Sequence, residues 1–278
     1  MKNCFNKIAL ALCFTTWVAQ AQEFTGQATY QSKMNRSSFE IDIPNMPEES
    51  KKQIQEQMYK AFDKTYLLYF NKTESIFEEE QKLEAPTKTN SGIKVQNNGG
   101  NDINYCNTKS KSFLIQTELL NKPFLISDTL TTPKWELLSE TKQIGNYTCY
   151  KAQKVKKVTQ EQIKEYEELV EEQKKSKTNF MELKAPKDVI TTAWYTPEIP
   201  VNHGPNLEWG LPGLILEIYD GSMSYLCTKI TLNPKNKVEI KKPNKGKKVT
   251  QTEFNIIEEE KLNSLNDGNG NIQINIQK

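Results

Sequence analysis

The chain has 278 residues, a formal net charge of +2 and a single histidine, and 26% of its residues are charged. Its cations are lysines except for Arg36, so it lacks the guanidinium groups that phosphate and nucleic-acid readers favour, and we expect no nucleic-acid partner. Neither clustered zinc ligands nor a glycine-rich phosphate loop occurs in the sequence, which predicts no metal and no cofactor.

The first 21 residues have the pattern of a secretory signal peptide. Lys2 and Lys7 precede a largely apolar stretch from Ile8 to Ala19, and small residues frame a cleavage site after Ala21. We expect an exported protein, periplasmic or secreted. The apolar stretch is too short to span a membrane.

A lipid anchor at Cys13 is the alternative, but Leu12 stands where such a site needs a small residue. We therefore predict that the protein is not a lipoprotein. The remaining chain fits one β-rich domain over residues 22–265, followed by a polar tail at 266–278.

Short strand patterns about ten residues apart, with turn residues between them, predict an antiparallel meander. The first pattern resembles an edge strand, residues 83–102 are expected to be a mobile loop, and Asp220–Gly221 suits a type I′ hairpin turn. The expected strands cover 24–34, 65–70, 74–81, 103–107, 112–118, 124–128, 135–143, 146–155, 189–196, 214–219 and 223–232.

Helices are expected at 47–64 and 159–177, and after the capping box that Thr250 forms with Glu253. The helix at 159–177 begins with a similar box and has only a narrow apolar stripe, so we interpret it as a solvated cover on the sheet, with a partner-docking helix as the alternative. The predicted fold class is mainly β (β-rich α+β): a curved antiparallel sheet with two to three helices on or beside it, by analogy with periplasmic lipoprotein carriers. Ile272, Ile274 and Ile276 alternate with polar residues and could add a last strand.

The most informative stretch is the run from Gly210 to Leu216, which follows the aromatic segment 193–200. Pro followed by Gly presets a tight turn, because proline fixes φ and glycine accepts a positive φ, and the apolar run then predicts a buried strand. The residues expected to shape this structural motif are Gly204, Pro205, Gly210, Pro212, Gly213 and Leu214.

Segments 193–200, 204–205 and 210–216 together resemble the signature of the GLPGLI family of exported bacterial proteins, whose activity is not established. Further resemblances lie at 74–77, at 144–152 and from Lys245 to Phe254. The resemblance implies export and a β-rich topology, and it implies no catalytic residue.

Large aromatic and apolar side chains in this block are candidates for an apolar binding cleft, with burial in the core as the alternative. The candidates are Trp194, Tyr195, His203, Trp209 and Leu211. His203 lies between prolines in a loop, so we expect it to be exposed, with a turn or capping role preferred to one as a general base.

Three cysteines remain after signal cleavage, an odd number for an oxidising compartment. Cys149 and Cys227 lie in strongly patterned strands and are the preferred disulfide pair. The alternative is that these two and Cys106 are all buried thiols.

The sequence therefore favours a non-enzymatic envelope protein that binds a lipid, another apolar ligand or an outer-membrane protein through a curved sheet. A periplasmic hydrolase using His203 with Glu198 or Glu208 is one alternative. A structural module of an outer-membrane export or uptake complex, with the helix at 159–177 as contact surface, is another.

Overall fold

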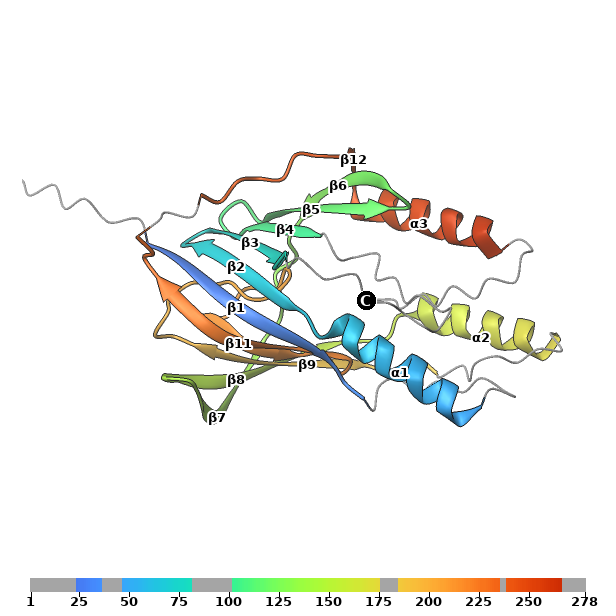
Figure 1. Cartoon of the computed structure of the whole chain (residues 1–278), viewed down its shortest axis with the longest axis horizontal. Coiled ribbons are helices and arrows are strands. Elements are labelled where there is room, and N and C mark those ends of the chain that lie inside the picture. The colour runs from blue at the N-terminus through green and yellow to red at the C-terminus, as the bar shows by residue number, and fades with distance from the viewer. Residues whose placement is uncertain (1–23, 37–46, 82–101, 176–184, 236–238, 267–278) are drawn as a thin grey trace, which may run out of the picture.

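The computed structural model describes residues 24–36, 47–81, 102–175, 185–235 and 239–266. These residues form one sheet of twelve strands and three helices (Figure 1). The elements are β1 (Thr25–Met34), α1 (Glu48–Phe62), β2 (Thr65–Asn71), β3 (Glu74–Glu79), β4 (Ile103–Asn107), β5 (Ser112–Leu119), β6 (Lys122–Thr129), β7 (Glu136–Ile144), β8 (Tyr147–Lys156), α2 (Gln160–Lys175), β9 (Val189–Thr196), β10 (Leu214–Tyr219), β11 (Met223–Leu232), β12 (Lys247–Val249) and α3 (Gln251–Asn266).

The strand order is β12-β6-β5-β4-β3-β2-β1-β11-β10-β9-β8-β7. Two antiparallel meanders, β2 to β6 and β7 to β11, meet on either side of β1, and the β-rich fold predicted from the sequence is confirmed. β12 adds the one parallel pair among these strands, beside β6. The prediction that β1 resembles an edge strand is wrong, because β1 pairs with β2 and β11 and buries Ala28 and Tyr30 completely.

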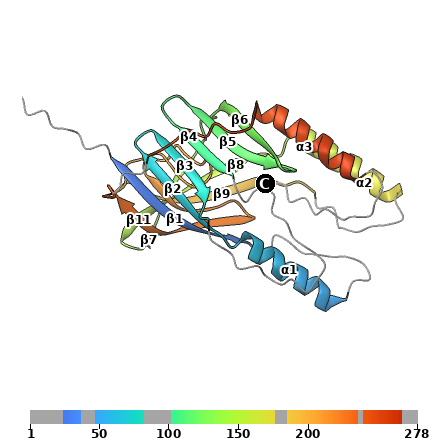
Figure 2. The ribbon, with the colours of Figure 1, turned by 45° about the horizontal axis from the view of Figure 1, so that its top comes forward.

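The sheet is curved and does not close. Figure 1 shows it turning from β6 and β5 at the top to β8 and β7 at the bottom, and the three helices project from the same end of it. Figure 2 shows α1 on one side of this end, with α2 and α3 together on the other. The helices thus flank this end of the sheet.

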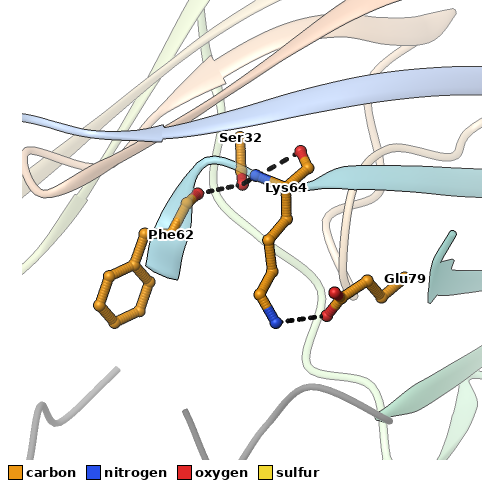
Figure 3. A network of polar contacts seen from close by, with 4 residues as sticks. All are labelled: Ser32, Phe62, Lys64 and Glu79. Carbon is orange, nitrogen blue, oxygen red and sulfur yellow. Dashed lines mark hydrogen bonds and ion pairs between the residues drawn. The ribbon is translucent and has the colours of Figure 1, made fainter. Parts of the chain in front are cut away.

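Helix α1 is tied to β1 by the side chain of Ser32 (Figure 3). The fully buried Ser32 hydroxyl donates to the carbonyl of Phe62 (2.5 Å) and accepts from the backbone N–H of Lys64 (3.2 Å). The Lys64 ammonium pairs with Glu79 on β3 at 2.7 Å. One serine therefore satisfies backbone groups that the end of the helix leaves without intrahelical partners.

Local sequence signals place the other helix starts. Thr159 and Gln162 bond reciprocally before α2, and Thr250 and Glu253 do so before α3, as the capping boxes predict. Lys157 also pairs with Asp188 at 2.6 Å, which joins the ends of β8 and β9 where α2 leaves the sheet.

The β10–β11 hairpin forms as predicted, but its turn is not type I′. The backbone N–H of Asp220 donates to the carbonyl of Met223 at 3.1 Å, so the two central residues are Gly221 and Ser222. A type I′ turn needs positive φ at both, and Gly221 has φ of +97° while Ser222 does not have a positive φ. The Asp220 carboxylate instead accepts the backbone N–H groups of Ser222 (2.9 Å) and Met223 (2.7 Å). Side-chain capping replaces the second left-handed residue.

The core consists of two clusters of buried side chains. The first lies on the sheet face that carries Tyr30, Phe77 and Ile215, which we call the inner face. The second joins β4, β5, β6 and β12 to Phe254 of α3, whose ring meets that of Phe124 at 5.3 Å. The predicted signal peptide, most of the loop at 83–102, the end of the helix at 176–177 and the tail lie outside the described residues.

Candidate functional site

Residues 197–213, between β9 and β10, form what we call the bridging loop because they contribute to both core clusters. Ile199, Val201 and Leu211 are buried in the first cluster, and Trp209 is buried in the second. The loop packs on the inner face, since the backbone at Gly204 lies against the side chain of Ile215. The most informative stretch of the sequence is thus part of the interior.

Backbone hydrogen bonds fix the path of the bridging loop. The N–H of Leu214 donates to the carbonyl of Ile199, and that of Ile215 donates to the carbonyl of His203, each at 3.0 Å. The N–H of Gly210 donates to the carbonyl of Asn202 at 3.3 Å. The loop returns beside its own start, so β10 begins with its apolar residues already buried.

Two glycines of the motif serve different purposes. Gly210 has φ of +94°, which explains a glycine there. Gly213 does not have a positive φ, so the reason predicted for it is wrong. A Cβ on residue 213 would lie 2.2 Å from the Thr196 carbonyl oxygen, and this close backbone approach excludes any larger residue.

The remaining motif residues divide between interior and surface. Gly204 and Pro205 are buried, Leu214 is fully buried, and Pro212 is exposed. Only a side chain, that of Ile215, stands in the way of a Cβ at Gly204. The motif is therefore architectural over most of its length.

The structure does not bring the predicted binding residues together in one cleft. Tyr195, Trp209 and Leu211 are at most 8% exposed and belong to the core, as the alternative interpretation has it. Trp194 faces the opposite side of β9 from Tyr195, because alternate residues of a strand point to opposite faces. Its ring lies 4.4 Å from the ammonium of Lys142, which also pairs with Glu217 at 2.7 Å.

His203 is 1% exposed, so the prediction of an exposed loop histidine is wrong. Neither ring nitrogen has a hydrogen-bond partner among the described residues. Burial lowers the pKa of His203 to about 4, and the Asn71 backbone and the Glu74 carboxylate oppose this shift only in part. The physical reason is the returning bridging loop, which carries residue 203 inward against β10.

The acids predicted to assist His203 have other partners. Glu198 accepts the backbone N–H of Thr148 at 2.9 Å, and Glu208 pairs with Lys154 at 2.5 Å. A general base must reach its substrate's proton, and a neutral, fully buried imidazole does not. The geometry therefore offers no support for a hydrolase built from these three residues.

All three described cysteines are free and buried, so the structure contains no Cys149–Cys227 disulfide. The structure agrees instead with the alternative prediction, that all three cysteines are buried thiols. Desolvation raises the pKa of Cys106 and Cys227 to about 12 and that of Cys149 to about 11. Thiols with such pKa values are poor nucleophiles at neutral pH.

A polar cluster that the sequence did not single out lies on β3 and β4. Tyr105 donates a short hydrogen bond to Glu74, Asn107 donates to the same carboxylate at 3.3 Å, and the Lys242 ammonium lies 5.3 Å from the Tyr105 ring. The Tyr105 bond lowers the pKa of Glu74. Because its members satisfy one another, the cluster is a structural anchor for the segment before β12.

The open edge of the sheet is the feature that sequence analysis missed. β7 pairs with β8 on one side and has no strand on the other among the described residues. The opposite edge, β12, is only three residues long and carries exposed Lys247 and Lys248. One sequence signal could have marked β7 as an edge, because it carries the charged residues Glu136, Glu140 and Lys142, and unlike its neighbour β8 it buries no side chain.

Apolar side chains stay exposed beside β7. Leu137 is 57% exposed opposite Ala152, and Tyr150 is 39% exposed with its ring 6.2 Å from that of Tyr195. In-register pairing puts Leu137 and Tyr150 on the inner-face side of the sheet. This margin of the inner face is therefore apolar and accessible.

Over the parts of the chain that the structure describes, no group of three His, Cys, Asp or Glu side chains is placed to hold a metal ion. None of the described helices combines the length and apolar character needed to cross a membrane.

A family model described as "Protein of unknown function (Porph_ging)" matches residues 135–217, from the start of β7 into β10. No curated protein matches the chain. Two solved structures of PNGF-II are similar: the P21 form has a TM-score of 0.47 and 17% identity, and the C2 form has a TM-score of 0.45 and 15% identity. Both matches cover 84% of this chain and 32% of that chain, so the chain spans about a third of the PNGF-II length.

An uncharacterized conserved protein from Thermus thermophilus is also similar, with a TM-score of 0.32 and 8% identity over 82% of this chain and 90% of that chain. Similarities of this size say nothing about activity. The segment that runs from Trp135 through the bridging loop to Glu217 is thus the part of the chain that matches a family of unknown function.

Proposed function

We propose that this chain is an exported, non-enzymatic protein of the GLPGLI type that binds an extended segment of an envelope protein along β7. The proposal of export rests on the predicted signal peptide, with cleavage after Ala21. The leucine at position 12 disfavours a lipid anchor at Cys13. The GLPGLI assignment is supported by the motif at 210–216, which lies within the segment that the family model matches. The observation that supports this proposal most directly is the edge of β7, which has no strand partner among the described residues.

An edge strand presents backbone N–H and C=O groups that an added strand satisfies. β7 offers nine residues for this, against three in β12. The register shift between Leu137 and Thr141 places four steps of β7 opposite two of β8. Such a bulge, with the charged residues Glu140 and Lys142 beside it, disfavours pairing of β7 with arbitrary strands of other proteins. We therefore expect β7 to accept only a segment that fits this bulge and these charges.

A protein partner is better supported than a lipid held in the interior. The bridging loop fills the inner face with the buried side chains of Ile199, Val201 and Leu211, where a carrier would need space for its ligand. The apolar surface that remains accessible is the margin at Leu137 and Tyr150. A flat margin beside an open edge suits an extended peptide.

Photo-crosslinking in the native envelope tests the proposal. A crosslinking amino acid at the exposed Ser139 of β7 is expected to capture a defined envelope protein through one extended peptide, identified by mass spectrometry. The same amino acid at Leu226, exposed on the central strand β11, is the matched control and should not capture that peptide. Equal capture at both sites, or a stoichiometric lipid in the purified protein, would contradict the proposal.

A further inference from the structure

The occupant of the β7 edge can be narrowed by the sequence that follows α3. Residues 271–277 read Asn-Ile-Gln-Ile-Asn-Ile-Gln, with isoleucine at every second position. A period of two places Ile272, Ile274 and Ile276 on one face of a strand and the amides on the other. Among segments outside the described residues, this one has an unbroken strand pattern and no proline.

Side-chain character matches the open edge. A strand added to β7 with its isoleucines on the inner-face side would cover Leu137 and approach Tyr150, both of which are exposed there. Its amides would face the opposite side, which carries Lys142. Lys278, directly after the segment, is opposite in charge to Glu136 on β7, whereas Glu140 already pairs with Lys151 at 3.0 Å. The pairing would therefore bury apolar surface and place unlike charges together.

Connectivity favours pairing between two copies. Helix α3 begins directly after β12, at the opposite edge of the sheet from β7, and its sixteen residues extend about 24 Å from there. Residues 267–270 can span at most about 14 Å. Figure 1 shows α3 near the top of the view, leading away from β7 at the bottom, so the described chain ends on the side away from the edge that the segment would have to reach.

We propose that residues 271–277 of one copy add as a strand to the β7 edge of a second copy. This rests on the proposed function, in that it assigns the binding edge an occupant. Donor and acceptor are different surfaces, so the contact is heterologous, and repeating it links copies into an open series.

Sedimentation of the full exported chain at increasing concentration tests this inference. The parent is expected to show an average mass that rises above the monomer. A tail variant, Ile272→Asn with Ile274→Asn and Ile276→Asn, and an edge variant, Leu137→Lys, are each expected to weaken association about tenfold or more, because each removes the apolar contact.

Mixing the two variants gives the sharpest result. The edge variant still has an intact donor segment and the tail variant still has an intact edge, so their mixture is expected to form a one-to-one dimer that neither forms alone. Ile256→Asn on α3 and Leu226→Lys on β11 replace comparably exposed apolar residues elsewhere and should associate like the parent. Circular dichroism checks that every variant is folded.

A parent that stays monomeric at all concentrations overturns the inference, and so does a mixture that fails to dimerise. If the crosslinker at Ser139 then still captures another envelope protein, the proposed function stands and only the identity of the occupant is wrong. If Ser139 captures nothing and the chain is monomeric, both fail.

Discussion

The carbonyl oxygen of Thr196 lies 2.2 Å from the position that a Cβ atom would take on Gly213. This contact joins the end of β9 to the start of β10 and sets where the bridging loop returns to the sheet. Because backbone, and not a flexible side chain, occupies the space, neither partner can yield without moving a strand end.

Gly213→Ala is therefore expected to destabilise the protein by about 3 kcal/mol or more, since overpacking against backbone forces the structure to shift. The control is Gly221→Ala in the β10–β11 turn, where a Cβ meets open space but φ is +97°. It should lose about 1–2 kcal/mol from backbone strain alone. Urea unfolding measures both, and an equal loss in the two variants would contradict this account.

The burial of His203 leads us to predict that the folded protein loses stability in acid. Its pKa in the folded protein is about 4, below the ordinary value of 6.5, so the unfolded chain binds more protons between these values. The stabilisation that comes from keeping His203 neutral is fully present above about pH 6.5. The free energy of unfolding then falls as the pH is lowered from there to about 4. The expected loss is about 3 kcal/mol, from about 1.36 kcal/mol per pKa unit.

His203→Leu tests that prediction, because it keeps an apolar filling and removes the titrating group. Carboxylates also titrate in this range, so the measured quantity is the difference in unfolding free energy between parent and variant at each pH. This difference is expected to change steadily between pH 6.5 and about 4 and to be constant outside the window. A difference that is independent of pH would show that burial does not hold the imidazole neutral.

The hydroxyl of Tyr30 donates to the carbonyl of Ile215 at 2.7 Å, and Tyr30 is completely buried. Tyr30→Phe leaves that carbonyl without its donor and is expected to cost about 1–3 kcal/mol. Tyr219→Phe is the control, because its hydroxyl bonds to Gly221 and Asn35 at an exposed position. We expect a change of less than about 0.5 kcal/mol there. Thermal unfolding of the two variants distinguishes them.

The three buried cysteines are expected to be unreactive in the folded protein. Their raised pKa values, about 11 to 12, keep them as thiols at neutral pH. A thiol reagent should label none of them within minutes at about pH 7.5 and all of them, Cys106, Cys149 and Cys227, after unfolding without reductant. Recovery of only one reactive thiol on unfolding would reveal a disulfide after all.

Local structure was largely predictable because its causes are local. The capping boxes at Thr159 and Thr250 and the hairpin around Gly221 depend on residues within a few positions of each other, and they formed as helix starts and a turn. The type of that turn was not predictable from Asp-Gly alone, since the Asp220 carboxylate competes for the same backbone donors.

The site was less predictable because it depends on contacts between residues distant in sequence. Nothing around His203 indicates burial; that follows from the loop's return against Ile215. The pairing of β1 with β11 joins the first described strand to one that is distant in sequence, and it is this pairing that makes β1 central and leaves β7 as the edge.

The amino-acid sequence by itself determined the helices and all the described strands except the short β12, where two of the helices begin, and that positions 210 and 213 need glycine. Tertiary structure alone decided why Gly213 is required, that the aromatic residues at 195 and 209 are core, and which strand is left unpaired. Periodicity and capping report on a residue's nearest neighbours along the chain, whereas burial and strand order arise when distant segments compete for the same partners.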